Sequence, residues 1–204
     1  MEEKLNVLAP EVAKVEEVDK NNLKLVLEPF ERGFGYTIGH SLRRILLSFM
    51  PGAAVSEVKI DGVEHEYGTI EGVKEDILDI LLNLKGLAIK LEGSGEVELG
   101  LNIKTPKTVT AGDLELPAGV EIVNPEHVIA TLVEPKKLSM TLKVKRGIGY
   151  QPAENNNDKS VDSLHLDAIF SPVKRVNYKV ENARVENRTD LDKLILDLET
   201  NGTI

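Results

Sequence analysis

Residues 27–52 read LEPFERGFGYTIGHSLRRILLSFMPG. Three glycines, Gly33, Gly35 and Gly39, follow an alternating apolar run and precede a run with helical spacing. Glycines in this position are typical of a phosphate-binding loop. The run that follows, however, carries more apolar residues than one buried helix face needs. The stretch therefore leaves two alternatives open, a nucleotide site and a surface that holds another protein.

The helix that the sequence predicts over residues 34–49 is apolar on more than one side. Besides one stripe of four apolar residues, it carries Leu46, Leu47 and Met50, which point elsewhere; the stripe consists of Ile38, Leu42, Ile45 and Phe49. A helix of this kind must be covered on more than one side. Its own sheet can cover one side, and no later segment has the pattern of a free helix of matching length. We therefore expect a partner to cover the other side.

The spacing of the glycines disfavours a nucleotide site. Gly33-x-Gly35-x-x-x-Gly39 is one residue longer than the dinucleotide fingerprint, and it lacks the Gly-Lys-Ser/Thr of a P-loop. A dinucleotide site also needs parallel strands around a helix, whereas hairpin signals dominate here. We instead interpret Gly33 and Gly35 as a tight strand-to-helix turn. Gly39 would let the helix approach another backbone closely.

The composition excludes several classes of function. The 204 residues include no cysteine, four scattered histidines and a formal net charge of -9. Disulfides and thiol catalysis are thereby excluded, and the negative charge argues against non-specific binding to duplex DNA. The histidines lack zinc-ligand spacing, and His65 and Glu66 would face opposite ways on a probable strand. We expect no metal, no cofactor and no catalytic site in this chain.

The sequence also predicts the cellular location. The N-terminus has neither the basic start nor the apolar core of a signal peptide, and no apolar run approaches the length that spans a bilayer. We therefore expect a cytoplasmic protein that does not associate with membranes.

Most of the chain has the period-two alternation of strands with one buried face. The predicted strands contain residues 23–28, 97–103, 138–144, 176–186 and 193–200. Gly- or Asn-containing stretches at 19–22, 60–63 and 93–96 predict hairpin connections. Residues 73–84 predict a second, ordinarily amphipathic helix that covers one face of a sheet and ends at Gly86.

These elements favour an α+β fold, in which an antiparallel sheet with helices on one face is interrupted by an inserted β-rich domain. We expect a discontinuous domain made of residues 1–51 and 173–204, with the inserted domain at 52–172. Residues 147–162 are polar and rich in Gly and Asn, which indicates a long loop.

Several long blocks run in order along nearly the whole chain: ERGFGYTIGHSLRRILLSFMPG (31–52), IDGVEHEY (60–67), VKEDILDILLNLKG (73–86), NPEHVIATL (124–132), KRGIGYQPA (145–153), LDAIFSPVKRVNYKVENARVENRTDLDKL (166–194) and ETNGTI (199–204). In these blocks the chain resembles the N-terminal domain of the bacterial RNA polymerase α subunit. The resemblance implies a homodimer that forms through helices and serves as the platform on which the large β and β′ subunits assemble. It also implies that the active site lies in β and β′.

The resemblance assigns roles residue by residue. Arg44 and Leu47 match positions that face the β subunit, and Lys85 and Leu166 match positions that hold β′. The dimer-building helix is implied to use Phe34, Ile38, Leu42, Ile45 and Phe49. Because the two α copies are identical but meet different large subunits, only one copy's Arg44 is expected to contact β.

Two departures from the family pattern limit these expectations. The loop AENNNDKSVDS (153–163) is short and lacks the acidic run of the family's activator-contact loop, so we do not expect activator contact there. In the family, the point matching NGTI is followed by a helix, a linker and a DNA-binding domain. From this sequence we expect weak dimerisation without the following helix and no binding of promoter DNA by this portion.

Two other functions remain as alternatives. One is a nucleotide-binding or transferase domain that uses the Gly33–Gly39 loop. The other is a stand-alone β-rich adaptor unrelated to transcription. Titration of the isolated chain with nucleotide tests the first alternative. Capture of the β subunit by the chain tests the second.

Overall fold

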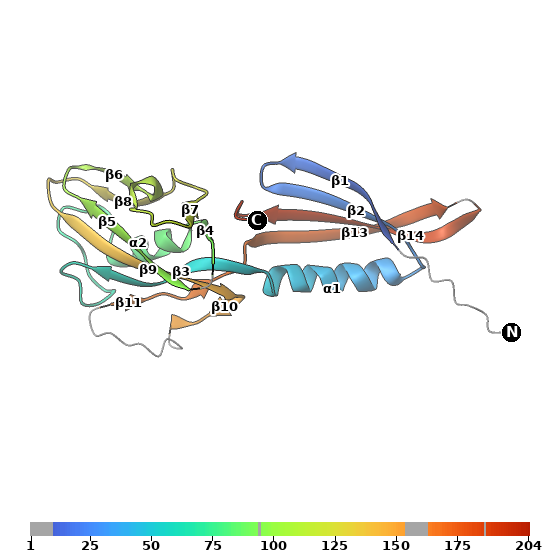
Figure 1. The fold of residues 1–204 in the computed structure, drawn as a ribbon, viewed down its shortest axis with the longest axis horizontal. Coiled ribbons are helices and arrows are strands. Elements are labelled where there is room, and N and C mark those ends of the chain that lie inside the picture. The colour runs from blue at the N-terminus through green and yellow to red at the C-terminus, as the bar shows by residue number, and fades with distance from the viewer. Residues whose placement is uncertain (1–9, 94, 154–162, 186) are drawn as a thin grey trace. The chain divides into compact units, whose positions relative to one another are not determined.

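The computed structural model describes residues 10–93, 95–153, 163–185 and 187–204. They form two compact units, each dominated by antiparallel sheet (Figure 1). The first unit contains the chain up to Met50 together with Val173–Gly202, and the second contains Pro51–Pro172. The first unit is therefore assembled from two segments that are far apart in the sequence.

The first unit is built on a four-stranded antiparallel sheet. Its strand order is β1 (Glu11–Asp19), β2 (Asn22–Phe30), β14 (Arg188–Thr200) and β13 (Val173–Val185). The turn between β1 and β2 confirms the hairpin predicted at 19–22. Strand β2, from the start of the chain, pairs with β14, from its end, so the sheet itself joins the two segments of the unit.

Helix α1 (Phe34–Ser48) packs on β13 and β14 of this sheet (Figure 1). Gly35 and Gly39 are its buried residues. A Cβ atom at Gly39 would lie 2.6 Å from Cδ2 of Tyr178 and 2.9 Å from Cδ1 of Leu194. The close approach that was expected at Gly39 is therefore made to side chains of the sheet, and not to another backbone. The missing side chain lets the helix settle into the sheet's apolar face.

The start of α1 is held by a buried carboxylate from the other segment of the unit. Gly33 precedes the helix with φ 88°, a left-handed conformation that glycine adopts without strain. Its N–H donates to Oδ2 of Asp192 at 2.7 Å, and the N–H of Gly35 donates to the same oxygen at 3.2 Å. Asp192 is only 7% exposed. The tight turn predicted at Gly33 and Gly35 is thus closed by a residue of β14.

The second unit contains a larger antiparallel sheet. Its order is β5 (Glu96–Ile103), β9 (Leu138–Ile148), β3 (Pro51–Ile60), β4 (Ile89–Leu91) and β7 (Val120–Ile122), and β11 (Leu164–His165) also pairs with β3. Two small two-stranded sheets accompany it: β6 (Lys107–Thr110) with β8 (Val128–Leu132), and β10 (Tyr150–Gln151) with β12 (Ala168–Ile169). A short 3-10 turn, η1, spans Ala111–Asp113.

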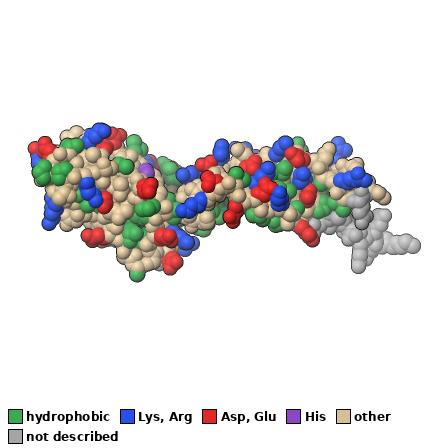
Figure 2. Space-filling view, turned by 90° about the horizontal axis from the view of Figure 1, so that it is seen from above, with side chains coloured by type: hydrophobic (Ala, Val, Ile, Leu, Met, Phe, Trp, Pro, Cys, Tyr) green, Lys and Arg blue, Asp and Glu red, His purple; other side chains and the backbone are tan. Residues whose placement is uncertain are grey.

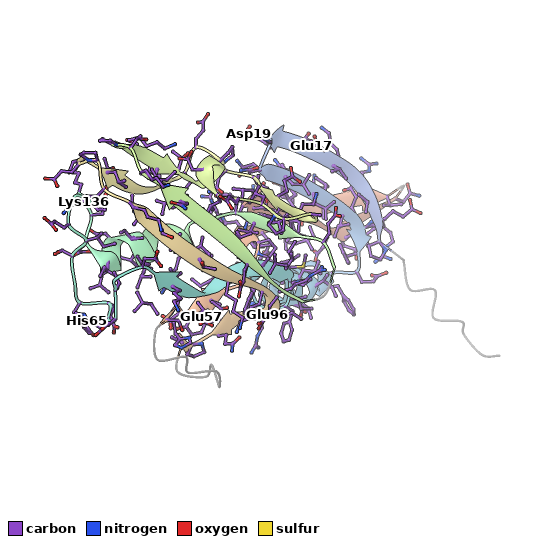
Figure 3. All side chains as sticks on the ribbon, turned by 60° about the vertical axis from the view of Figure 1, so that its left-hand side comes forward. Glu17, Asp19, Glu57, His65, Glu96 and Lys136 are labelled. Carbon is purple, nitrogen blue, oxygen red and sulfur yellow. The ribbon has the colours of Figure 1, made fainter. Side chains whose placement is uncertain are left out.

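One face of this sheet carries an ion-pair row. The ammonium group of Lys143 on β9 lies 2.9 Å from Glu96 on β5 and 3.8 Å from Glu57 on β3 (Figure 3). Alternate residues of β9, such as Leu142 and Val144, are fully buried in the core of the unit. The strands therefore have the polar and apolar faces that their alternation predicted.

Helix α2 (Ile77–Lys85) begins four residues later than the sequence predicted. Val73 and Lys74 are bonded to β8 instead: Val73 forms a bridge with Leu132, and the N–H of Lys74 donates to the carbonyl of Thr131 at 3.0 Å. Asp76 then caps the helix by accepting from the N–H of Asp79 at 2.7 Å. Val73 and Lys74 therefore pair with β8 and are not part of α2, although their apolar spacing had assigned them to its first turn.

Two of the predicted hairpins are not hairpins. Gly62 and Gly93 do adopt positive φ, 80° and 91°. However, the turn at 60–63 leads from β3 into a loop, and the stretch at 93–96 joins β4 to β5, which pair with different strands. His65 lies in the first of these loops, so its expected place on a strand is wrong (Figure 3).

The described residues contain few helices, and they do not form the layer that was expected. Only α1 lies on the first unit's sheet within the described part of that unit, and α2 belongs to the second unit. The fold is therefore mostly antiparallel sheet. Neither α1 nor α2 is long and apolar enough to cross a membrane.

We predict that Asp192→Ala lowers the free energy of unfolding of the first unit by about 2 kcal/mol, because two backbone N–H groups at the helix start lose a charged acceptor. Urea unfolding followed by circular dichroism measures the change. Asp197→Ala, on the same strand but exposed, is the matched control and should change stability little. Equal stability of the two variants would contradict this role of Asp192.

Candidate protein-interaction surfaces

The backbone N–H groups of the glycine loop are already bonded to an anionic side chain of the same unit. A helix N-terminus binds phosphate through free backbone N–H groups. Here the N–H groups of Gly33 and Gly35 donate to Asp192, whose carboxylate occupies the position that a phosphate oxygen would take. A phosphate group would have to displace a buried carboxylate of like charge. This arrangement disfavours the nucleotide-binding alternative.

The five apolar residues predicted at the dimer interface divide into two sets. Ile38 and Leu42 are half-buried and pack against the core of the first unit. Phe34, Ile45 and Phe49 are 56%, 50% and 65% exposed. Large side chains left in water lose much of the free energy that burial would supply, about 1.5–3 kcal/mol each. The flank of α1 that carries Phe34, Ile45 and Phe49 is therefore a candidate interaction surface.

The sheet itself extends beyond the helix. α1 packs on β13 and β14, whereas β1 lies at the opposite edge of the sheet. On β1, Val12 and Val15 are opposite Leu27 and Leu25 of β2, which contribute to the core under α1, so these valines share its face. Both valines are more than half exposed. Apolar surface is thus left open on the sheet as well as on the helix.

Arg44 and Leu47 lie on one side of α1, three residues apart. Arg44 is exposed, and Leu47 is half-buried against the core. Residues at this spacing are neighbours on a helix surface. They form a small mixed patch in which a mobile guanidinium adjoins a fixed apolar side chain, the combination that is common at protein interfaces.

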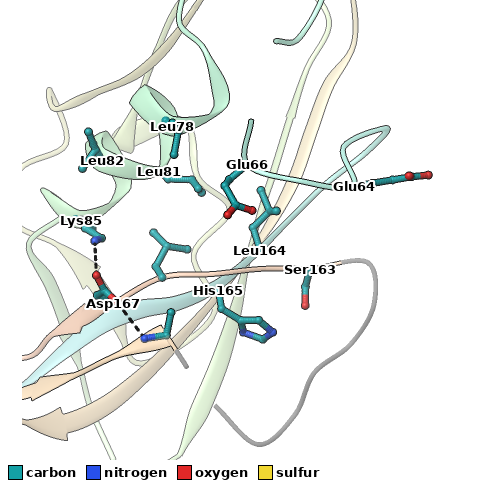
Figure 4. Close-up of a pocket in the computed structure, with 12 residues that line it drawn as sticks. Glu64, Glu66, Leu78, Leu81, Leu82, Lys85, Ser163, Leu164, His165 and Asp167 are labelled. Carbon is teal, nitrogen blue, oxygen red and sulfur yellow. Dashed lines mark hydrogen bonds and ion pairs between the residues drawn. The ribbon is translucent and has the colours of Figure 1, made fainter. Parts of the chain in front are cut away.

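The second unit contains a cleft of about 460 Å³ beside α2 (Figure 4). Lys85 and Leu166, which are far apart in the sequence, both line it. The structure therefore brings together the two residues that the sequence assigned to one partner. Leu166, however, is only 3% exposed and belongs to the core, so its side chain supports the cleft wall instead of projecting from it.

Asp167 fixes the position of Lys85 in this cleft. Its Oδ2 lies 3.3 Å from Nζ of Lys85, and its Oδ1 accepts from the N–H of Ala153 at 3.0 Å. These bonds, first that from Ala153 and then that from Lys85, together with the Tyr150 side chain, hold the pKa of Asp167 below its usual value. Sequence reasoning missed Asp167, although it directly follows Leu166.

The loop at 153–163, in which no activator contact is expected, lies outside the described residues over residues 154–162. On the face drawn in Figure 2, acidic and basic side chains are interspersed.

Within the described part of the chain, no group of three or more His, Asp or Glu side chains comes together as metal ligands would.

A comparison with protein-family models found a match to a known family. The matching family is described as the RNA polymerase Rpb3/RpoA insert domain, and the match covers residues 58–171. These residues include almost all of the second unit, with α2 and the cleft.

Acid should weaken the Asp167 contacts. Because the folded-state pKa of Asp167 is lowered, its contribution to stability is present above the unfolded value, 3.8, and is lost as the pH falls through the folded value. We therefore predict that Asp167→Asn is less stable than wild type at pH 7 and that the difference shrinks below about pH 3.8. Thermal unfolding at both pH values tests this.

Asp61→Asn is the control for this measurement. Asp61 pairs with Lys137 at 3.5 Å in an exposed position, and exposed ion pairs contribute little to stability. A wild-type advantage over Asp167→Asn that is the same at pH 7 and pH 3 would contradict the assignment.

Proposed function

Since the chain belongs to the RNA polymerase Rpb3/RpoA insert-domain family, and is thus an α-type N-terminal domain of an RNA polymerase, we propose that it is the assembly portion of a bacterial α subunit. In this proposal it acts in the cytoplasm as a homodimer on which the large β and β′ subunits assemble. It performs no chemistry itself, and the catalytic residues belong to the large subunits.

The observation that carries the proposal is the two-sided character of α1. One side, with Gly35 and Gly39, is buried on the unit's own sheet. The flank next to this buried side leaves Phe34, Ile45 and Phe49 largely exposed. A second copy offers the same apolar surface, and self-complementary apolar surfaces are what two-fold dimers bury. Pairing through α1 would place helices from both copies against each other.

The Arg44 patch supports recruitment of a large subunit. It lies on α1 but does not include the exposed apolar residues that the dimer would bury. Dimerisation and capture of β can therefore use different sides of the same helix. In a symmetric dimer the patch occurs twice, and we propose that only one copy of it contacts β.

The alternatives fit the observations less well. A nucleotide-binding role requires N–H groups that Asp192 already occupies. An adaptor unrelated to transcription would not explain the family match over residues 58–171.

We predict that the double variant Ile45→Glu with Phe49→Glu shifts the chain toward monomer, because two charges would have to be buried in an apolar interface. Both residues are exposed in the single chain, so its fold should be retained. Sedimentation across a concentration series measures the shift. The control is Tyr67→Glu, at a side chain in the second unit that is 78% exposed. Unchanged self-association of the double variant would contradict the proposed dimer surface.

A separate experiment tests the Arg44 patch. Arg44→Ala should weaken capture of the β subunit by about 2 kcal/mol, the effect of truncating an interface arginine that dominates binding. Arg43→Ala, next to it and also exposed, is the matched control and should bind β as wild type does. Quantitative pull-down of β with both variants decides the matter. Equal capture by both would remove Arg44 from the proposed interface.

A further inference from the structure

Strand β1 is held in the first unit by β2. It lies at the edge of the sheet, and β2 is the only strand that pairs with it among the described residues (Figure 1). None of its nine residues is buried. Its three valines, Val12, Val15 and Val18, are 58%, 55% and 70% exposed. Little apolar burial therefore opposes the separation of β1 from β2, and segments of this kind open more easily than the core of a domain.

The hydrogen-bonded ladder between β1 and β2 is interrupted twice. The register shifts between Val12 and Lys14, and it shifts again between Glu17 and Asp19. Each shift leaves a residue of β1 without a partner on β2 and disrupts the ladder locally. The nine-residue strand is thus paired in short stretches.

The charges of β1 contribute little to its pairing. Glu11 lies directly opposite Glu28 of β2, and like charges in this position destabilise a strand pair. Lys14 forms its ion pair with Glu16, which is on the same strand, so this pair does not join β1 to β2. A favourable pair across the strands is that of Glu16 with Lys24.

The turn between the two strands contains an unsatisfied polar atom. Asp19 pairs with Asn22, which leaves Lys20 and Asn21 as a two-residue loop. Oδ1 of Asn21 is buried and has no hydrogen-bond donor in the described part of the chain, which is costly. The carbonyl of Asn21 accepts from the N–H of Thr200 at 2.9 Å. Opening of the turn would therefore expose Oδ1 to water, while this bond keeps the start of β2 in the sheet.

We propose that β1 opens from β2 in the free chain and that the edge of β2 then accepts β1 of a second copy. The exchanged strand makes the same contacts as the original strand, so the exchange costs little free energy once β1 has opened. The edge of β2 presents unpaired N–H and C=O groups, which readily pair with another strand. This inference goes beyond the proposed function, because it does not use the exposed apolar residues of α1.

Register and charge select β1 of a second copy as the occupant. An incoming strand has to place a carboxylate opposite Lys24 and apolar side chains opposite Leu25 and Leu27. β1 supplies Glu16 and two valines at these positions. Strand β13 of a second copy, with four basic residues and one acidic residue, would bring like charges toward Lys24.

Single cysteines report the exchange directly, because the chain contains no cysteine of its own. A tagged chain with Glu16→Cys is mixed with an untagged chain with Lys24→Cys under mild oxidation, and the disulfide-linked heterodimer is measured on a non-reducing gel. The control replaces Lys24→Cys by Asp197→Cys, since Asp197 lies opposite Lys24 on β14, one strand further from β1. We expect about tenfold more heterodimer than in the control, because cysteines with Cα atoms more than about 7 Å apart do not form a disulfide.

A chain that carries both Glu16→Cys and Lys24→Cys measures the opening itself. Its intrachain disulfide should form readily and should hold β1 closed. Hydrogen exchange is then compared for the β1 amides that bond to β2. We expect these amides to exchange about tenfold faster in wild type than in the oxidised double variant, and reduction should restore the fast rate. Failure of this disulfide to form would contradict the register of β1 on β2, and the inference with it.

The remaining outcomes separate strand exchange from other contacts. A heterodimer yield no higher than in the Asp197→Cys control would overturn the inference, even if β1 exchanges hydrogen rapidly, because the strand would then open without being replaced. Loss of the heterodimer when Ile45→Glu and Phe49→Glu are added would identify a contact across the α1 surface and would also overturn it. A heterodimer that persists in this background supports strand exchange, whether or not the proposed α1 dimer is correct.

Discussion

The bond between the Asp192 carboxylate and the start of α1 is the interaction on which the first unit depends. A buried carboxylate is costly unless donors surround it, and the first free N–H groups of a helix are such donors. Gly33 and Gly35 bring two of them to within 2.7 and 3.2 Å of one oxygen. Because Asp192 comes from the returning segment of the chain, this bond joins both halves of a discontinuous unit at the point where the helix begins.

The glycines and the carboxylate act together on the position of α1. Side chains at Gly35 or Gly39 would collide with Val180, Tyr178 or Leu194, so the helix lies closer to the sheet than an ordinary helix could. Ile38, Leu42 and Leu46 pack against the core beside these glycines, whereas Phe34, Ile45 and Phe49 stay exposed. The start of α1 thus uses the chemistry of a phosphate-binding loop, an anion at a helix N-terminus, but the anion is a side chain of its own unit.

Much of this fold could be predicted from the sequence, because period-two alternation depends only on one face of a strand being buried. β2, β5, β9, β13 and β14 were recognised in this way. The sides of α1 were not, because Leu46, Leu47 and Met50, which were expected to point elsewhere, pack against the core of its own unit. Non-local pairing could not be predicted. Val73 and Lys74 have helical spacing, yet their bonds to β8 delay the start of α2. Likewise, the glycine turn after β4 gives no sign that β5 pairs elsewhere.

The residues that fix the candidate surfaces were the hardest to find. Asp192 lies in DLDKLILDLE, where the acidic residues look alike in the sequence, and only the register of β14 brings this one under the start of α1. Asp167 is similarly ordinary until the fold places it beside Lys85 and Ala153.

Amide hydrogen exchange at Gly33 and Gly35 tests the central claim most directly. Both N–H groups lie before or in the first turn of α1, where no intrahelical carbonyl is available to them, and N–H groups in such positions normally exchange rapidly. If the Asp192 carboxylate holds them, both should exchange as slowly as the amides in the middle of α1, and they should lose this protection together in an Asp192→Asn variant. Rapid exchange of both amides in the wild-type protein would contradict the account.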